Sequence, residues 1–248
     1  KIDYVLHQAA LGSVPRSIED PINTNKSNIS GFLNILFLSK KYSVDKFIYA
    51  ASSSTYGDNL KLPKVEDEIG EPLSPYAITK YVNELYANNF AKTFNMKAIG
   101  LRYFNVFGPR QCPDGAYAAV IPRWIKSISK NQKIEIYGKG DTTRDFTYVD
   151  NVVRANILSA LHDFKNESHY VFNIACGEKI SLLDLYNEIK SIIGNEDLKP
   201  VFMDYRVGDV KHSLADISFA KKIIGYEPKI ALSEGLRRTI QSMINAQH

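Results

Sequence analysis

A tyrosine and a lysine one helical turn apart are the residues of this sequence best placed to do chemistry. Tyr76 and Lys80 lie four positions apart in the segment Tyr-Ala-Ile-Thr-Lys. Positions i and i+4 of a helix share one face. A lysine ammonium beside a phenol stabilises the phenolate, which lowers the phenol pKa from about 10 toward the working pH. The spacing therefore predicts a tyrosine that acts as a general base.

A run of hydroxyl side chains precedes this pair. Ser52, Ser53 and Ser54 directly follow the apolar segment 46–51, about 20 residues before Tyr76. Doubly wound folds bind their ligands where such strands end, at the carboxyl edge of the sheet. A Tyr-x-x-x-Lys spacing or a serine turn alone has an ordinary structural explanation. Their combination on neighbouring strand–helix units favours a catalytic site.

The elements needed to position these residues alternate between strands and helices, as in a parallel α/β sheet. We expect strands over 2–9, 46–51 and 97–103, alternating with helices over 17–42 and 75–94. Strand–helix–strand repeats imply crossover connections and a parallel α/β sheet. The regular alternation of strands and helices ends after Phe104, where Gly-Pro and Pro-Asp-Gly mark loops. Further helices are expected over 118–129, 149–161, 182–193, 218–224 and 233–244, and strands over 134–137, 170–175 and 200–203, of which 170–175 could rejoin the first sheet.

Composition narrows the class of protein. The chain has 248 residues, of which 44% are hydrophobic and 23% charged, which excludes disordered, collagenous and coiled-coil proteins. A net charge of +4 without a basic block argues against nucleic acid as a partner and is compatible with a phosphorylated small molecule. Two cysteines favour a reducing compartment, five scattered histidines predict no metal site, and no apolar stretch has membrane-spanning length.

An ordered set of short motifs resembles a known family. The sequence is similar to extended short-chain dehydrogenase/reductases, in particular to nucleotide-sugar 4-epimerases of the UDP-N-acetylglucosamine type. The resemblance rests on the segments His-Gln-Ala-Ala (7–10), Asp-Pro (20–21), Asn-Ile-Ser-Gly (28–31), YAASSSTYG (49–57), Ser-Pro-Tyr (74–76) with Lys80, LRYFNVFG (101–108), Arg-Asp-Phe (144–146) with Val-Asp (149–150), and Arg-Val-Gly-Asp (206–209). It spans the whole chain, and the order of the motifs makes it specific.

The resemblance implies a fold and a division of the chain. The expected architecture is a Rossmann-like parallel α/β sheet joined to a smaller mixed α/β domain. Residues 1–106 and about 148–176 would form an incomplete NAD-binding domain, and residues 107–147 and 177–248 the nucleotide-sugar domain. The Gly-rich phosphate loop of such folds does not occur in this sequence. Because the chain also lacks an initial methionine, we interpret it as part of a longer protein with roughly 80 to 90 preceding residues.

The resemblance also assigns roles around the cofactor. Tyr76 would be the base on the sugar 4-hydroxyl. Lys80 would bind the nicotinamide ribose and lower the Tyr76 pKa, and one of Ser52, Ser53 and Ser54 would bond the sugar oxygen. The cofactor would be NAD, bound by Gln8, Ala9, Ala10, Leu11, Ser27 or Asn28, Tyr76, Lys80 and Tyr103.

Substrate contacts are implied in the same way. Arg144 and Arg206 would clamp the diphosphate, for which planar guanidinium groups are suited. Asp209 would accept the ribose hydroxyls, and Ser213 would leave room beside the sugar 2-substituent. The remaining expected substrate residues are Gly12, Ser13, Asn105, Gln111 and Ala119.

The implied reaction is NAD-dependent C4 epimerisation of a UDP-N-acetylhexosamine, either UDP-GlcNAc/UDP-GalNAc or the uronic acid forms, through a 4-keto intermediate. Related dehydratases carry an acidic pair next to the strand-end threonine, where this chain has Ser53, Ser54 and Thr55. A nucleotide-sugar dehydratase or reductase of the same fold and a noncatalytic nucleotide-sugar-binding fragment remain alternatives.

The resemblance finally implies an assembly and a setting. The helices over 17–42 and 75–94 would pair across a homodimer as a four-helix bundle, although the same apolar residues could merely cover their own sheet. The sequence shows no targeting signal, and with the NAD requirement this predicts a cytoplasmic enzyme that supplies polysaccharide or glycan precursors.

Overall fold

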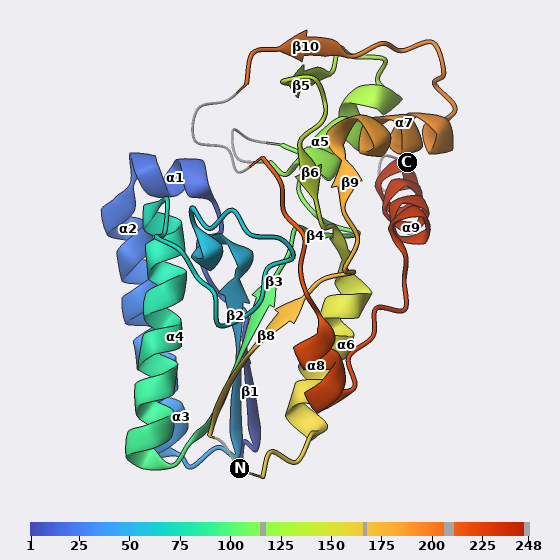
Figure 1. The fold of residues 1–248 in the computed structure, drawn as a ribbon. Coiled ribbons are helices and arrows are strands. Elements are labelled where there is room, and N and C mark those ends of the chain that lie inside the picture. Colours follow the sequence, from blue (N-terminus) through green and yellow to red (C-terminus); the bar gives the residue numbers. More distant parts are fainter. Residues whose placement is uncertain (115–117, 166–167, 206–210, 246–248) are drawn as a thin grey trace.

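A four-stranded parallel sheet forms the centre of the molecule (Figure 1). The computed structural model describes residues 1–114, 118–165, 168–205 and 211–245. The sheet consists of β1 (Tyr4–His7), β2 (Lys46–Ser52), β3 (Lys97–Tyr103) and β8 (His169–Ile174), hydrogen-bonded in that order. The predicted α/β class is confirmed, and the segment expected to rejoin the first sheet does so as β8 beside β3.

Helices cover both faces of this sheet. One face carries α1 (Val14–Glu19), α2 (Pro21–Asn25), a π-helical turn η1 (Lys26–Gly31), α3 (Phe32–Lys41) and α4 (Pro75–Phe94), and the other carries α6 (Val149–Leu161) and α8 (Ser218–Ile224) (Figure 1). Alternate residues of β2 face opposite ways, so Phe47 and Tyr49 pack toward α3 and α4 while Ile48 packs toward α6. Because both faces are buried, β2 is almost continuously apolar.

The helix expected over 17–42 is interrupted at its start. The backbone leaves the helical region at Asp20, with φ −134° and ψ 73°, which ends α1. The Asp20 carboxylate then accepts a hydrogen bond from the Asn23 amide and caps α2, whose first residue is Pro21. Proline suits the first position of a helix because its missing N–H would have no partner there. The Asp-Pro pair therefore separates α1 from α2.

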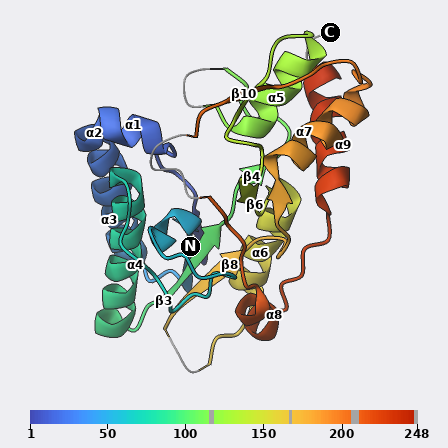
Figure 2. The ribbon, with the colours of Figure 1, turned by 45° about the horizontal axis from the view of Figure 1, so that its top comes forward.

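A second group of elements stands at the carboxyl end of the sheet (Figure 2). It comprises α5 (Val120–Ser129), β5 (Glu135–Tyr137), α7 (Leu182–Ile193), β10 (Val201–Met203) and α9 (Leu232–Asn245), with the short strands β4 (Val106–Phe107), β6 (Thr143–Arg144), β7 (Thr147–Tyr148) and β9 (Ile180–Ser181). These elements share their own apolar cluster, which includes Trp124, Tyr186 and Leu236. The separate cluster supports the two-domain division, which stays a prediction.

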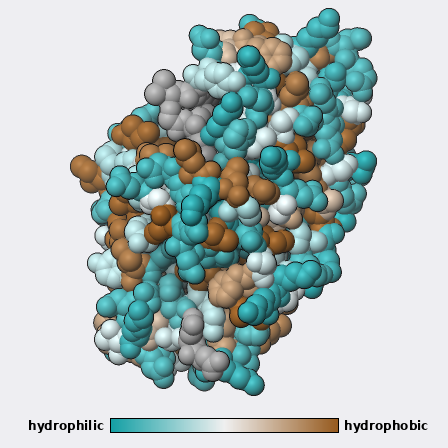
Figure 3. All heavy atoms as spheres, in the orientation of Figure 1, coloured by the Kyte–Doolittle hydropathy of each residue, from teal (hydrophilic) through white to brown (hydrophobic). Residues whose placement is uncertain are grey.

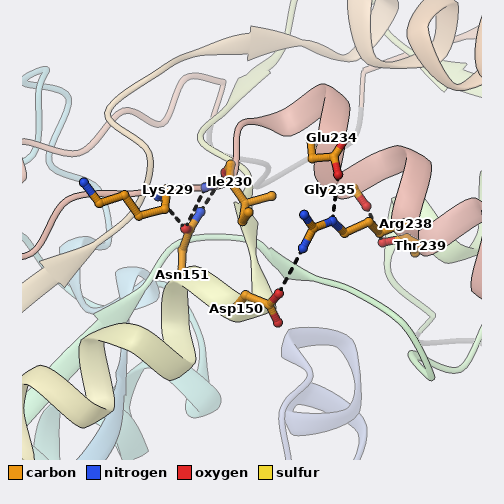
Figure 4. A network of polar contacts seen from close by, with 8 residues as sticks. All are labelled: Asp150, Asn151, Lys229, Ile230, Glu234, Gly235, Arg238 and Thr239. Atoms are coloured by element: carbon orange, nitrogen blue, oxygen red, sulfur yellow. Dashed lines mark hydrogen bonds and ion pairs between the residues drawn. The ribbon is translucent and has the colours of Figure 1, made fainter.

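Polar contacts join the C-terminal helix to α6 (Figure 4). The Asn151 side chain donates to the carbonyl oxygen of Ile230 and accepts from the backbone amides of Lys229 and Ile230. Arg238 on α9 contacts both Glu234 on its own helix and Asp150 at the start of α6. Exposed ion pairs contribute little, about 0–1 kcal/mol each, so the buried Asn151 contacts carry more of this attachment.

The surface has a marked apolar region over the first helices. Figure 3 shows hydrophobic side chains gathered over the corner formed by α1 and α2, where Ile18 and Ile22 are exposed. Further exposed apolar side chains on the same helical layer are Ile35, Phe37, Leu38, Ile78 and Leu85. Within the described residues no helix is long and apolar enough to cross a membrane.

Candidate active site

Tyr76 is fixed in the first turn of α4. The helix begins at Pro75, and the Ser74 hydroxyl accepts a hydrogen bond of 3.1 Å from the Ala77 amide as a side-chain cap. The amide of Tyr76 itself donates to the Ser17 hydroxyl of α1, at 3.0 Å. The phenol is half-buried and hydrogen-bonded to the Ser52 side chain. Two helices and the end of β2 therefore position the tyrosine.

Lys80 occupies the next turn of the same face and is buried. Its ammonium donates a hydrogen bond of 2.8 Å to the carbonyl oxygen of Ala50 and lies 6.0 Å from the centre of the Tyr76 ring. Burial lowers the Lys80 pKa to about 8, and the nearby Glu84 carboxylate opposes this shift. Because Lys80 has two further N–H groups, it can donate to the hydroxyls of a bound ligand.

The expected acidification of the tyrosine is wrong in direction for the polypeptide alone. Burial raises the Tyr76 pKa above its usual value of 10, and the hydrogen bond with Ser52 only partly offsets this. Desolvation disfavours the charged phenolate more than this hydrogen bond favours it. Ionisation at neutral pH therefore requires a further favourable interaction with the phenolate.

The structure separates the three serines. Ser52 ends β2 and is the one hydrogen-bonded to Tyr76. Ser54 donates from its hydroxyl to the Ser52 hydroxyl at 2.9 Å, so Ser54, Ser52 and Tyr76 form a chain of hydroxyl groups. Ser53 and Ser54 line a cleft of about 410 Å³ that opens beside this chain. The position of the hydroxyl chain makes proton exchange between the cleft and the phenol chemically feasible.

On the predicted cofactor side, polar side chains from three elements meet beyond the ends of β1 and β3. The Tyr103 hydroxyl donates to Gln8 at 2.8 Å and accepts from Asn156 at 2.8 Å, and Gln8 donates to Asn156 at 3.0 Å. This closed triangle joins β1, β3 and α6. Burial raises the Tyr103 pKa to about 12, so this phenol stays neutral. Asn156 was not foreseen, because nothing in its local sequence points to the other two residues.

Asn28 fixes the loop that follows β1. Its side chain accepts from the Leu11 amide at 2.7 Å and donates to the Leu11 carbonyl and to Thr79 of α4, both at 3.1 Å. Ala9 and Ala10 precede this point, and Gly12 follows it with open space where a Cβ would lie. Of the two expected alternatives, buried Asn28 makes these contacts, whereas Ser27 lies half-buried beside it on the π-helical turn.

Two cavities meet at Asn105 and Arg144. The first is the cleft beside the serines, which Ser213 also lines. The second, of about 330 Å³, extends among α5, β5 and β6 and includes Arg123 and Lys211. Asn105 has a left-handed backbone, with φ 34°, and donates to the Asp145 carbonyl at 3.0 Å. The arrangement can hold an elongated ligand with its anionic part near Arg144.

Other expected substrate residues have clear places in the fold. Ser13 caps α1 by accepting from the Arg16 amide, and Gln111 donates weakly to the Val106 carbonyl at 3.4 Å. Ala119 is the residue immediately before α5. Ser13, Gln111 and Ala119 are not among the described residues that line the two cavities. Arg206 and Asp209 lie outside the described residues, so their roles and those of the other site residues stay predictions.

Asp145, next to Arg144, is a buried structural carboxylate. It accepts hydrogen bonds from the backbone amides of Cys176 and Gly177, each at 3.0 Å, and from that of Ala215 at 3.3 Å. Burial raises its pKa to about 6, although these amides oppose the shift. Asp145 therefore holds the end of β8 against the segment that contains Ser213.

Comparison with known proteins identifies the family. The sequence model of the NAD dependent epimerase/dehydratase family matches residues 1–175. The UDP-glucuronate 4-epimerase of Thermodesulfobacterium geofontis is 37% identical over 96% of this chain and 72% of its own length.

Solved structures agree with this match. The UDP-N-acetylglucosamine 4-epimerase of Methanobrevibacter ruminantium, in complex with UDP-N-acetylmuramic acid, has a TM-score of 0.93 and 40% identity, covering 98% of this chain and 77% of that one. The UDP-glucose 4-epimerase of Thermotoga maritima, with UDP-glucose, also has a TM-score of 0.93 and 40% identity, covering 99% and 78%. The parallel sheet and the Tyr76–Lys80 pair agree with these matches. This chain therefore belongs to the NAD dependent epimerase/dehydratase family and is an NAD-dependent isomerase.

Proposed function

We propose that the protein catalyses NAD-dependent C4 epimerisation of a UDP-N-acetylhexosamine, either UDP-GlcNAc/UDP-GalNAc or the uronic acid forms, through a 4-keto intermediate. The observation that carries this proposal is the joint placement of Tyr76, Ser52 and Lys80 at the end of β2, where the neighbouring residues Ser53 and Ala77 line a cleft. Three relatives in support are 4-epimerases of UDP-glucuronate, UDP-N-acetylglucosamine and UDP-glucose, so they favour the reaction without selecting one sugar.

The residues present fit the expected cofactor. A buried ammonium with two spare donors at Lys80 suits the hydroxyl pair of a ribose. The Leu11 loop, fixed by Asn28, and the Gln8–Tyr103 pair would bound the rest of the site. When bound, NAD supplies the oxidising group that takes hydride from the sugar C4 and returns it, and its positive ring charge favours a phenolate nearby.

The polypeptide supplies the proton transfer. The Tyr76 oxygen takes the proton of the sugar 4-hydroxyl and later returns it. The hydrogen bond from Ser52 holds the phenol in place and stabilises its charged form, while the Lys80 ammonium adds a favourable Coulomb interaction at a ring distance of 6.0 Å. Ser54 continues the hydroxyl chain to the cleft, where it can contact the sugar.

The same geometry proposes how the nucleotide sugar lies. Arg144 and Asn105, where the two cavities meet, would hold the diphosphate. The hexose would then occupy the cleft with the serines and Ser213, and the nucleoside would occupy the second cavity. Arg206 is still predicted to bind the diphosphate and Asp209 the ribose. The residues still predicted to lie near the sugar or the nucleotide are Gly12, Ser13, Gln111 and Ala119.

The residues at the end of β2 favour a dehydratase less than an epimerase. Elimination of water needs a carboxyl acid–base pair at the strand end, but this chain places the hydroxyl residues Ser53, Ser54 and Thr55 there. Thr55 is also fully buried, so its hydroxyl does not reach the cleft. Epimerisation, which needs only one group for proton exchange at the 4-oxygen, is the reaction that these residues favour.

Incubation of the protein with NAD and UDP-GlcNAc or its uronic acid form, followed by proton NMR, tests the proposal. The expected product is the C4 epimer without net formation of NADH, and the Tyr76→Phe variant should lose this activity while it still binds UDP. A 4-keto-6-deoxy product would instead establish a dehydratase, and binding without turnover would establish a noncatalytic protein.

We also propose that the protein forms a homodimer through the α3 and α4 layer. Exposed apolar side chains on both helices support this proposal, including Phe37 and Leu85. A hydrophobic surface of this kind commonly marks an interface. The cytoplasmic location and the supply of polysaccharide precursors stay predictions from the family resemblance.

A further inference from the structure

Lys64 is a buried lysine that lines the cleft. Its backbone is fixed against the segment that follows Ser213, because its amide donates to the Leu214 carbonyl at 2.8 Å and its carbonyl accepts from the Asp216 amide at 2.9 Å. The residue is only 4% exposed, and it lines the same cleft as Ser53, Ser54 and Ser213. The lysine therefore borders the space proposed for the hexose.

No carboxylate within the described part of the chain compensates this charge. The Lys64 ammonium donates to the carbonyl oxygen of Asn59 and lies 6.0 Å from the centre of the Tyr56 ring. Each salt bridge among the described residues joins other groups. Burial lowers the Lys64 pKa, and no acidic neighbour opposes that shift. The carbonyl of Asn59 accepts from only one of the three ammonium N–H groups, so the others can donate to an anionic group of a ligand bound in the cleft.

The position of Lys64 indicates which part of a nucleotide sugar could provide that counter-ion. The diphosphate is proposed to lie where the two cavities meet, at Asn105 and Arg144, and both of these residues line both cavities. Lys64 lines only the cleft that contains the serines. A negative charge carried by the hexose itself would lie on this side, whereas UDP-GlcNAc has no charge on its sugar.

We propose that Lys64 determines specificity by binding a carboxylate carried by the hexose of the substrate. This inference rests on the proposed function, since it assigns the sugar end of that site. The carboxylate could stand at C6, as in a uronic acid, or on a lactyl ether at C3, as in muramic acid. Both present the same group to an ammonium that has two N–H groups besides the one bonded to Asn59.

Calorimetric titration of the protein with UDP, UDP-GlcNAc, its C6 uronic acid and UDP-N-acetylmuramic acid tests the proposal. The wild type should bind a carboxylated sugar more tightly than UDP-GlcNAc, and the sugar that gains more identifies the position of the carboxylate. Lys64→Met keeps the length of the side chain but removes its charge. It should lower the affinity for that carboxylated sugar by about 10- to 100-fold, as for the loss of a hydrogen bond to a charged group. Its affinities for UDP and UDP-GlcNAc should change less than about twofold.

Matched variants separate this role from a structural one. Lys61→Met removes an exposed lysine three positions away, which is paired with Glu68, and should leave all four affinities unchanged. Lys64→Arg should retain the preference for the carboxylated sugar. Weaker binding of UDP itself by Lys64→Met would place the lysine at the diphosphate and overturn the proposal, as would equal affinity of the wild type for charged and neutral sugars.

The wild-type comparison does not depend on whether Lys64→Met folds. It also distinguishes the two proposals from each other. If the carboxylated sugar binds through Lys64 but no UDP-sugar is epimerised, the specificity proposal holds and the proposed reaction fails. If UDP-GlcNAc is epimerised and the wild type shows no preference for a carboxylated sugar, the reaction holds and the role of Lys64 is refuted.

Discussion

The ammonium of Lys80 donates a hydrogen bond of 2.8 Å to the carbonyl oxygen of Ala50, two residues before Ser52. This bond ties α4 to the end of β2 at the point where Tyr76 and Ser52 meet. It also keeps the ammonium in a buried place, and burial is what lowers the Lys80 pKa to about 8. The contact that positions the lysine therefore also limits the pH range in which it carries a charge.

From this pKa we predict a loss of epimerase activity above about pH 8. Protonated Lys80 supports the Tyr76 phenolate, and the ammonium loses its proton as the pH rises through about 8. The kcat of the Lys80→Met variant should be lower by about 100-fold or more, which is the size of general-base effects. Its remaining activity should no longer fall as the pH rises above about 8. Rate measurements from pH 6 to 10 check this. A wild-type profile that stays flat to pH 10 would refute it.

The same lysine should change the stability of the protein with pH. Its pKa falls from 10.5 in the unfolded chain to about 8 in the folded one. Between these values the unfolded chain binds more protons, so the free energy of unfolding should increase as the pH rises from 8 to 10.5. Urea unfolding at pH 8 and pH 10, compared between the wild type and Lys80→Met, isolates this contribution. An equal change in both proteins would exclude Lys80 as its source.

The buried pair Arg102–Glu84 should contribute strongly to stability when one partner is removed. The guanidinium donates to both Glu84 oxygens, at 2.9 and 2.7 Å, and to the Glu66 carbonyl at 2.8 Å. We predict that Arg102→Met, which leaves a buried carboxylate unpaired, lowers the free energy of unfolding by about 3–5 kcal/mol. Urea denaturation measures this loss.

The double variant Arg102→Met with Glu84→Leu provides the control. It removes both charges and leaves apolar groups of similar size, so it should recover most of the lost stability. A double variant as unstable as Arg102→Met would show that the Glu66 contact and not the ion pair is decisive.

The proposed homodimer gives a prediction about α4. Leu85 is 50% exposed on the helical layer that carries the apolar surface. Leu85→Lys should place a charge in the interface and convert the dimer to a monomer, as measured by light scattering after gel filtration. Leu161→Lys is the matched control, because Leu161 is 70% exposed on α6, across the sheet. A monomeric wild type, or an equal effect of both variants, would contradict the proposed interface.

Local spacing was enough to predict some of the site. The Tyr76–Lys80 relation depends only on the period of one helix, and the parallel sheet follows from alternating strands and helices. The break between α1 and α2 had a local signal too, in Asp20-Pro21, but the helix was expected to begin at Ser17. Features set by a few neighbouring residues can be predicted in this way.

Contacts between distant segments could not be predicted. The bonds from Asn28 to Thr79 and from Gln8 to Asn156 join residues 51 and 148 positions apart. Burial produces further effects that a motif does not show, including the raised Tyr76 pKa. Asp145 illustrates both points, because this residue, next to Arg144 in the sequence, is a buried acceptor for three distant amides. Such features depend on the packed structure and not on the spacing of residue types.

The size of the residue at position 213 should determine which neutral sugars react. Ser213 lines the cleft with the serines, and its amide donates to the Thr143 carbonyl at 3.1 Å, which fixes its backbone beside Arg144. Ser213→Tyr adds an aromatic ring to that wall. We expect it to lower kcat/KM for UDP-GlcNAc by about 10- to 100-fold, as for a lost or clashing group in a fitted pocket, and to spare UDP-glucose.

Ser218→Tyr places the same ring on an exposed residue outside this cleft and controls for a general effect of the substitution. Epimerisation of both sugars by all three proteins, measured by NMR, gives the ratio of kcat/KM values. Because the N-acetyl group is the only difference between the sugars, a change in this ratio locates the acetyl group near residue 213. An equal loss for both sugars in Ser213→Tyr would mean that the ring blocks the whole cleft, and unchanged rates would remove Ser213 from the sugar pocket.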